Sequence, residues 1–337
     1  YALKEGFTWT AISTSVTSFR YVEGGFLFDS AGSMGFAYSR ENLKYIIANL
    51  NSKIAEEAFR FISPTIKFMP GQVASIPCNV DYGKRDEVTS IADELIAFSK
   101  SDWDSFETSW DFKKHPLLRN VSTISEAFAQ WQAECDDRFN QLKANEEELN
   151  RIFIDIYGLQ DELTTEVEDK DVTVRKADLQ RDIKSLLSYA VGCMFGRYSL
   201  DKPGLIFAGG NFDSVYWKYK GQAALDENDS PIEGGYAGIS LAEYHYPKFH
   251  DTDDWETATW LSYEPDVDNV IPITDEEYLD DDIVSRLCTW LKAVYGADTL
   301  EANLDYIAKA LGNKGSTSRE IIRNYFLNDF FKDHCQT

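Results

Sequence analysis

The sequence is poor in cysteine, with five cysteines in 337 residues and no CxxC motif. They are widely separated along the chain: Cys78, Cys135, Cys193, Cys288 and Cys335. An odd number of isolated cysteines argues against a disulfide framework and against a zinc site, because both need paired residues. We therefore expect buried thiols in a reducing compartment, which predicts a cytoplasmic protein.

Long apolar runs are also absent. No run approaches the roughly 20 residues that cross a bilayer, so the sequence predicts no membrane partner. The first ten residues, YALKEGFTWT, lack the basic start and the apolar centre of a signal peptide. They also lack an initiator methionine, and we expect the chain to be a fragment of a longer protein.

Basic residues are scarce, with 33 Lys and Arg against 57 Asp and Glu and a net charge of −24. The imbalance is uneven, because residues 1–100 hold 10 basic and 11 acidic side chains, whereas residues 101–337 hold 23 and 46. An acidic surface repels nucleic acid. Any contact with nucleic acid is therefore expected in the first hundred residues.

These first hundred residues combine strand and helix patterns. Residues 7–36 alternate between apolar and polar side chains over FTWTAISTSV, SFRYV and GFLFD, which predicts strands. Ser39 is placed to cap a helix over 41–62, where apolar side chains form one stripe, and Pro64 ends it. The segment TIKFMPGQVASIP that follows looks extended.

After about residue 87 the apolar spacing becomes that of helices. Asp178 is placed to open one helix, and Gly296 and Gly312 to end two of the last three. The predicted fold is α+β, with a small mixed α/β domain followed by a mostly helical domain. We expect a first domain at 1–87, a helical region at 88–205, an acidic loop-rich insertion at 206–282 and C-terminal helices at 283–337.

Two glycines separate a strand pattern from a helix pattern in FLFDSAGSMGFA, residues 26–37. A dinucleotide fingerprint needs GxGxxG directly before the helix, whereas Gly32 and Gly35 are spaced GxxG and three further residues intervene. We interpret the stretch as a turn. The Walker lysine loop, HExxH, GxSxG and the Asn-Pro-Pro-aromatic loop of adenine-N6 methyltransferases are also absent. The chain is therefore predicted to hold no cofactor of its own and no catalytic residues.

Residues 251–282 hold 13 acidic side chains and no basic one. With His245 and His250 nearby, a metal site is one interpretation, and a self-contained metal-dependent hydrolase is kept as an alternative. The EF-hand pattern is not matched, and no lysine accompanies these carboxylates as is common in nucleases. A solvated surface, or a contact for a basic partner, is favoured, so no metal ligand is predicted.

Several segments resemble a known family. SFRYVEGGFLFDSAGSMGFA and NLKYIIANLNSKIAEEAFRFISPTIKFMPGQVASIP resemble the target-recognition region of single-chain adenine-specific DNA methyltransferases and of Type I specificity subunits. The segments SKSDWDSFETSWDFKKHPLL, EEELNRIFIDIYGLQDELT and LLSYAVGCMFGRYSLDKPGL are similar to the PglX family of BREX phage-defence methyltransferases and their Type II restriction–methyltransferase relatives. The resemblance is weakest between residues 220 and 270.

The resemblance implies a division of labour. In such enzymes an N-terminal domain binds S-adenosylmethionine and methylates adenine N6, a target-recognition domain selects the DNA sequence, and a helical part supports the clamp on DNA. This chain lacks the catalytic motifs, so the resemblance implies a C-terminal recognition and scaffold fragment that is inactive alone. The implied partners are double-stranded DNA and other BREX proteins, and S-adenosylmethionine belongs to the parent enzyme.

Candidate DNA-binding residues lie in the first hundred positions. Sequence recognition needs donors and acceptors on strands or loops, together with cations for the phosphates. Arg20 is the candidate for a guanine contact, and it lies in a segment dense in Ser and Thr. The full candidate set is Thr8, Thr10, Ser18, Arg20, Arg40, Lys44, Lys67, Lys84 and Arg85. The resemblance also implies that a leucine-rich helix ends in Leu50-Asn51-Ser52-Lys53, and Lys53 is instead expected to help cap and pack that helix.

A second alternative to DNA recognition is a protein-interaction module. In that interpretation the acidic helical part binds other defence proteins, and the first domain only packs. Steep salt dependence of duplex binding by the first hundred residues distinguishes the two.

Overall fold

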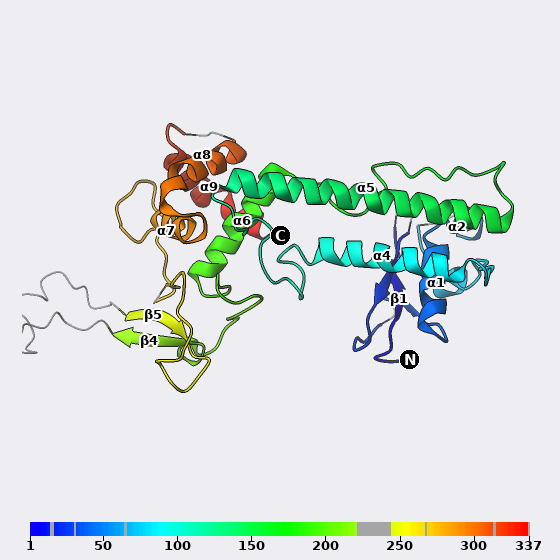
Figure 1. Cartoon of the computed structure of the whole chain (residues 1–337), viewed down its shortest axis with the longest axis horizontal. Coiled ribbons are helices and arrows are strands. Elements are labelled where there is room, and N and C mark those ends of the chain that lie inside the picture. Colours follow the sequence, from blue (N-terminus) through cyan, green and yellow to red (C-terminus); the bar gives the residue numbers. More distant parts are fainter. Residues whose placement is uncertain are drawn as a thin grey trace, which may run out of the picture. The chain divides into compact units, whose positions relative to one another are not determined.

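The computed structural model describes residues 1–13, 17–29, 32–63, 66–220, 244–266, 268–312 and 315–335. Its fold is α+β, as predicted, with small antiparallel sheets and predominant helices. The chain divides into two compact units (Figure 1). Unit 1 comprises residues 1–102 and 134–176, and unit 2 comprises residues 103–133 and 177–337. The sequential boundaries expected at 87, 205 and 282 stay predictions.

Unit 1 begins with a three-stranded antiparallel sheet in the order β2-β1-β3. Its strands are β1 (Gly6–Trp9), β2 (Phe19–Val22) and β3 (Met34–Gly35). Phe7 pairs with Tyr21 and Trp9 with Phe19, so these aromatic side chains share one face of the sheet. The expected strand GFLFD is wrong, because residues 25–29 form a loop between β2 and β3.

Two helices follow the sheet, α1 (Arg40–Leu50) and α2 (Lys53–Ile62). Ser39 caps α1 as predicted, since its side chain accepts a hydrogen bond from the Asn42 N–H. The expected single helix over 41–62 is wrong, because the chain breaks at Asn51 and Ser52. The side-chain amide of Asn51 accepts a hydrogen bond from the Phe19 N–H at 2.8 Å and donates one to the Phe19 C=O at 2.9 Å. A continuous helix would not bring this side chain to Phe19.

The sheet packs its aromatic face on these helices. Phe7, Trp9 and Phe19 form one core with Leu43 and Phe59, among others. The opposite side of α1 packs against α4 (Arg85–Trp103) and the unit 1 part of α5 (Ile124–Tyr157) in a second core. Because α1 is covered on two sides, it holds the sheet against the helices of unit 1 (Figure 1).

The segment expected to be extended after Pro64 contains a short helix, α3 (Pro70–Val73). That part of the expectation is wrong, because Pro70 occupies the first helical position, where its missing N–H costs nothing. The chain beside β1 is extended nearby, since Ile12 forms an isolated antiparallel bridge with Lys67.

Unit 2 is built mainly from helices. They are α6 (Leu179–Met194), α7 (Ile283–Tyr295), α8 (Leu300–Leu311), α9 (Ser318–Asn328) and α10 (Phe330–His334), with 3-10 turns η1 (Phe212–Ser214) and η2 (Ala297–Thr299). Asp178 caps α6, and Gly296 and Gly312 end α7 and α8 with positive φ, as predicted. A hairpin of β4 (Tyr216–Lys220) and β5 (Tyr244–Phe249) adds an aromatic cluster.

All five cysteines are free thiols. Cys135 and Cys193 are buried, but Cys78 and Cys335 are exposed, so the expectation of five buried thiols is wrong. Within the described ranges, no helix is both long and apolar enough to cross a membrane.

Candidate nucleic-acid interface

The outward face of the three-stranded sheet carries four of the predicted DNA-binding residues. Thr8 pairs with Arg20 across β1 and β2, directly between the buried aromatic pairs. Since strand side chains alternate, Thr8 and Arg20 lie on the face opposite the core. Thr10 and Ser18 flank the Trp9–Phe19 pair, and both are exposed. The structure therefore brings a guanidinium and three hydroxyls together on one small surface.

Arg20 is held by a neutral partner. One of its Nη atoms donates to Thr10 Oγ1 at 3.0 Å, and it forms no ion pair with any described residue. The Thr8 hydroxyl is directed elsewhere, since it donates to the Ser33 carbonyl at 2.9 Å. Arg20 thus presents an exposed, uncompensated positive charge whose direction a hydroxyl helps to fix.

Lys67 lies next to this surface. Its backbone pairs with Ile12, two residues beyond Thr10, and the Phe68 N–H donates to Ala11 C=O at 2.9 Å. Lys67 is exposed. Residues 14–16, where the predicted polar segment continues, lie outside the described residues.

Arg40 and Lys44 do not join the outward face. Both are on α1, which covers the opposite, aromatic face of the sheet. Arg40 Nε lies 3.6 Å from Glu5 Oε2, and that oxygen accepts the Tyr21 hydroxyl at 2.6 Å. Burial raises the pKa of Tyr21, and its bond to Glu5 raises it further, so the phenol stays a donor. Lys44 Nζ donates to Asp93 Oδ2 at 2.5 Å.

Lys84 and Arg85 lie at the start of α4, also away from the outward face. Lys84 Nζ is 2.9 Å from Glu87 Oε2, and Arg85 Nε is 3.6 Å from Asp86 Oδ1. The two acidic residues suit the positive end of the helix dipole. Each exposed pair contributes about 0–1 kcal/mol, so a phosphate could replace it at little cost. A role of these cations in binding phosphate stays a prediction.

The Leu-Asn-Ser-Lys segment is structural, as expected for Lys53. The Lys53 N–H donates to the Asn150 side chain at 2.9 Å, and Ser52 Oγ donates to Asn49 C=O at 2.7 Å. Asn51, for which the sequence suggested no contact, bonds both backbone groups of Phe19. The signal that marked its position was the family resemblance, which ends a leucine-rich helix at Leu50-Asn51-Ser52-Lys53.

The glycine stretch does not fit S-adenosylmethionine. At Gly35 a Cβ would lie 2.1 Å from the ring of Phe7, so the space that this glycine leaves is filled by the protein's own aromatic ring. The first turn of α1 contains Glu41 and is capped by Ser39, which leaves little attraction for a ligand carboxylate. The glycines serve strand packing and a turn, and no step of methyl transfer is derived from them.

The acidic stretch of unit 2 is partly used to hold that unit together. Lys202 Nζ lies 3.1 Å from Asp251 Oδ2, and Arg286 and Arg323 pair with Asp266 and Asp282 respectively. Burial raises the pKa of Asp282, but the Ser285 N–H and Arg323 outweigh it and lower the pKa below the usual value. Across the described parts of the chain, no three His, Cys, Asp or Glu side chains gather as around a metal ion. The hydrolase alternative therefore gains no support.

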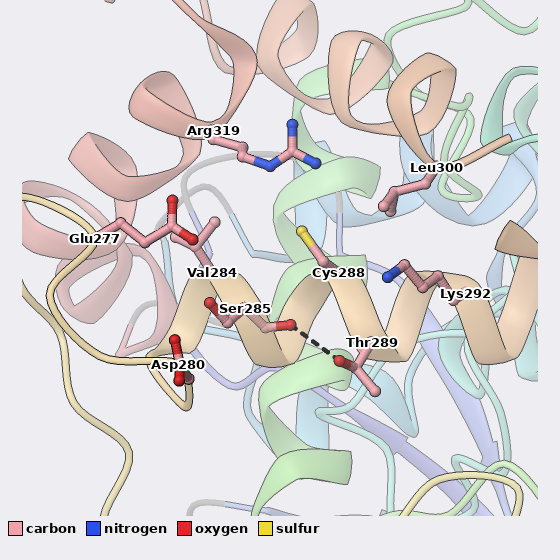
Figure 2. A pocket seen from close by; sticks show the side chains of 9 residues that line it. All are labelled: Glu277, Asp280, Val284, Ser285, Cys288, Thr289, Lys292, Leu300 and Arg319. Atoms are coloured by element: carbon pink, nitrogen blue, oxygen red, sulfur yellow. Dashed lines mark hydrogen bonds between the residues drawn. The ribbon is translucent and has the colours of Figure 1, made fainter. Parts of the chain in front are cut away.

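A polar hollow in unit 2 is balanced in charge, with two acidic and two basic side chains in its lining. Its volume of about 290 Å³ is at the lower end of the range of typical ligand pockets, roughly 300–1,000 Å³. Figure 2 shows Cys288 and Lys292 on one side of α7, facing Arg319. Arg319 is already engaged by Glu301, at 2.6 and 2.8 Å, and burial raises the pKa of the Cys288 thiol. Neither group is prepared for a ligand.

Two curated proteins are similar to this chain over its whole length. One is "Adenine-specific methyltransferase PglX" from Lacticaseibacillus casei (strain Zhang), which is 42% identical over 346 residues, covering 100% of this chain and 25% of that protein. The other is "Adenine-specific methyltransferase BrxX" from Escherichia coli O9:H4 (strain HS), 31% identical over 360 residues, covering 99% of this chain and 26% of that protein. No family model matches the chain.

The chain spans about a quarter of the length of the curated relatives it matches. The aligned region covers both units, including the stretch between residues 220 and 270. This chain therefore matches, over its whole length, one part of the adenine-specific methyltransferases PglX and BrxX.

Proposed function

We propose that this chain is the DNA-recognition and scaffold part of an adenine-N6-specific DNA methyltransferase of the BREX phage-defence type, acting in the cytoplasm. S-adenosylmethionine would be bound, and the methyl group transferred, by the part of such an enzyme that lies outside this chain. The relatives support methylation of adenine, and the outward sheet face of unit 1 supports a role in sequence recognition.

The sheet face has the chemistry that base recognition requires. A two-stranded ribbon fits the major groove of B-DNA, and arginine binds guanine O6 and N7 with two hydrogen bonds. Arg20 lies on such a ribbon, opposite Thr8, with the hydroxyls of Thr10 and Ser18 nearby. A methyltransferase must also turn its target base out of the helix, so the recognition part would select which adenine is turned out.

The observation that carries the proposal is the neutral partner of Arg20. The cations Arg40, Lys44, Lys84 and Arg85 each lie within 4 Å of a carboxylate, whereas the Arg20 guanidinium donates to Thr10 and forms no ion pair among the residues that the structure describes. A guanidinium that already has a carboxylate partner would have to exchange it for DNA. Arg20 can donate to a base without giving up an ion pair, so we assign it the guanine contact and Lys67 a phosphate contact.

Other BREX proteins are proposed as further partners through the acidic loop of unit 2. Asp253, Asp254 and Glu256 lie in this loop, close to the aromatic hairpin of β4 and β5. Exposed carboxylates would attract a basic protein surface and would keep DNA away from this side of unit 2.

The first test replaces Arg20 by Ala in a full-length methyltransferase that contains this chain. Loss of one two-bond base contact costs about 1–3 kcal/mol, which is roughly 5- to 150-fold in discrimination at one base pair. We expect the methylated sites, mapped by sequencing of genomic DNA, to become degenerate at one position. Arg60→Ala is the matched control, because Arg60 is exposed but is paired with Glu56 and Glu57.

The salt dependence of duplex binding completes this test. The salt slope is the steepness with which the logarithm of the binding constant falls with the logarithm of the salt concentration. A base contact contributes little to this slope, whereas each lost phosphate contact lowers it by about one. We therefore expect Arg20→Ala to leave the slope nearly unchanged and Lys67→Ala to reduce it. Unchanged site choice and unchanged affinity in Arg20→Ala would refute the assignment.

A further inference from the structure

The end of the sheet where β1 begins carries an exposed apolar surface. Five large exposed side chains lie in this region, and we call them the apolar end surface: Tyr1, Leu3, Phe26, Leu27 and Phe28. Leu27 is 77% exposed, and it lies between two exposed phenylalanines. Three consecutive apolar residues in solvent are unusual for a folded protein and indicate a contact surface.

The surface is preorganised by the backbone. Gly25, with φ of 105°, donates its N–H to Leu3 C=O at 2.9 Å, which fastens the loop to the chain before β1. At the other end, Asp29 accepts from the Gly32 N–H at 2.7 Å. The loop that presents Phe26, Leu27 and Phe28 is therefore anchored on both sides.

Aromatic contacts join the separate segments into one surface. The Phe36 ring lies 5.0 Å from the Tyr1 ring and 5.5 Å from the Phe28 ring, measured between centroids. Phe36 thus supports the first residues of the chain and the loop at once. Despite this support, the outer sides of Tyr1 and Phe28 stay in solvent, at 78% and 44% exposure.

The charges around this surface do not suit nucleic acid. Lys4 lies over the Tyr1 ring at 5.8 Å, while Glu23 and Asp29 lie in the loop itself. The nearby Arg40 is paired with Glu5. DNA-binding surfaces depend on an excess of cations, which is missing here. An apolar surface with few, balanced charges fits another protein surface.

We propose that the apolar end surface docks against the remainder of a PglX-type methyltransferase, the portion that lies outside this chain. The chain spans about a quarter of its relatives' length, so most of such a protein is available as the occupant. Packing between parts of one polypeptide buries about 600–1,500 Å² and leaves an exposed apolar surface when one part is studied alone. This proposal rests on the proposed function as part of such a methyltransferase and does not require that Arg20 contacts guanine.

Hydrogen–deuterium exchange tests the occupant directly. Amides of residues 23–29 are compared in this chain alone and in a full-length methyltransferase that contains it. We expect exchange to be slowed about tenfold or more in the full-length protein without DNA. Equal exchange in both would overturn the proposal. Protection that appears only when duplex DNA is added would overturn the proposal and indicate that DNA covers the surface. Protection in the isolated chain that accompanies dimer formation would overturn it and indicate that a second copy of the chain covers the surface.

A variant separates docking from folding. In the isolated chain, Leu27→Ser should leave the melting temperature unchanged, because the side chain is already in solvent. In the full-length protein the same substitution should restore fast exchange of residues 23–29 and speed proteolysis between the parts. Trp110→Ser is the matched control, since Trp110 is also fully exposed but lies elsewhere, in unit 2. If Leu27→Ser and Trp110→Ser behave alike in the full-length protein, docking by this surface is refuted.

Discussion

At the scale of single residues, the contact between Thr10 and Arg20 sets the direction of the exposed guanidinium. Thr10 Oγ1 accepts a hydrogen bond from Arg20 at 3.0 Å, which leaves the other guanidinium N–H groups free to donate. Arginine recognises guanine with two parallel hydrogen bonds in a fixed geometry. A change in the direction of the guanidinium therefore weakens this contact more than it would weaken a contact made by a point charge. If Arg20 makes the proposed guanine contact, Thr10 acts through it as a positioning residue.

Thr10→Val keeps the shape of the side chain and removes the acceptor. Because a hydrogen bond of this kind is worth about 0.5–1.5 kcal/mol, we expect discrimination at the base pair read by Arg20 to fall by roughly 2- to 12-fold. The degeneracy of methylated sites in the full-length enzyme measures it. Thr10→Ser retains the hydroxyl and should restore the wild-type preference. Equal site choice in Thr10→Val and wild type would contradict the positioning role.

Glu146, on α5 in unit 1, makes the stability of that unit depend on pH. Burial, together with the nearby Asp171 and Glu147 and against the effect of Lys53, raises the pKa of its carboxyl to about 7. The folded state therefore holds a proton that the unfolded state has already released above pH 4.5. Stability must fall as the pH rises from about 4.5 to 7, and it stays lower above that range.

Glu146→Gln tests this dependence. A shift of this size corresponds to about 3 kcal/mol, so the variant should be more stable than the wild type at pH 8 by up to that amount. At pH 4.5 the two proteins should unfold at similar denaturant concentrations. Urea unfolding at several pH values measures the difference, with Glu162→Gln, at an exposed glutamate of the same unit, as the control. Parallel pH profiles for wild type and Glu146→Gln would exclude the effect.

At the scale of secondary-structure elements, Asn51 joins the α1–α2 break to the edge of the sheet. Its side chain satisfies both the N–H and the C=O of Phe19, which point away from β1 at the edge strand β2. An open edge strand is a site for unwanted pairing with another chain. The break between α1 and α2 therefore places Asn51 against Phe19, which lies 32 residues away in the sequence.

Asn51→Ala should destabilise unit 1 without altering its fold. Two backbone groups of Phe19 lose their partners, which predicts a loss of about 1–3 kcal/mol in the free energy of unfolding. Denaturant unfolding measures the loss. Asn42→Ala, on the first turn of α1, is a control of the same chemistry, and it should change stability far less. A loss in Asn51→Ala no larger than that in Asn42→Ala would show that the bridge to Phe19 contributes little.

The elements show where sequence patterns suffice and where they fail. Alternation in β1 and β2 placed Thr8 and Arg20 on one face, because strand period depends only on neighbouring residues. The apolar stripe over 41–62 is continuous through Asn51, so the apolar spacing does not reveal the break, which was indicated only by the family resemblance at Leu-Asn-Ser-Lys. The ion pairs of Arg40 and Lys44 with Glu5 and Asp93 join residues 35 and 49 positions apart, and such pairs need the folded chain.

At the scale of the whole molecule, negative charge is distributed unevenly along the chain. Residues 1–100 are nearly neutral and contain the outward sheet face, whereas the acidic side chains accumulate later. Part of that negative charge is compensated inside unit 2 by Lys202, Arg286 and Arg323. The rest would repel DNA and so favour binding at the sheet face of unit 1.

Added S-adenosylmethionine should leave the melting temperature of this chain unchanged. A ligand that binds only the folded state stabilises it by about 2.7 kcal/mol at a concentration 100 times its Kd, so binding would be plain in a thermal melt. The glycine stretch that resembles a cofactor loop is filled by Phe7 at Gly35, and the helix after it begins with Glu41. The full-length enzyme, melted with the same additive, is the positive control. A clear rise in the isolated chain would mean that the methyl donor binds here, and the proposed division between recognition and methyl transfer would then have to be abandoned.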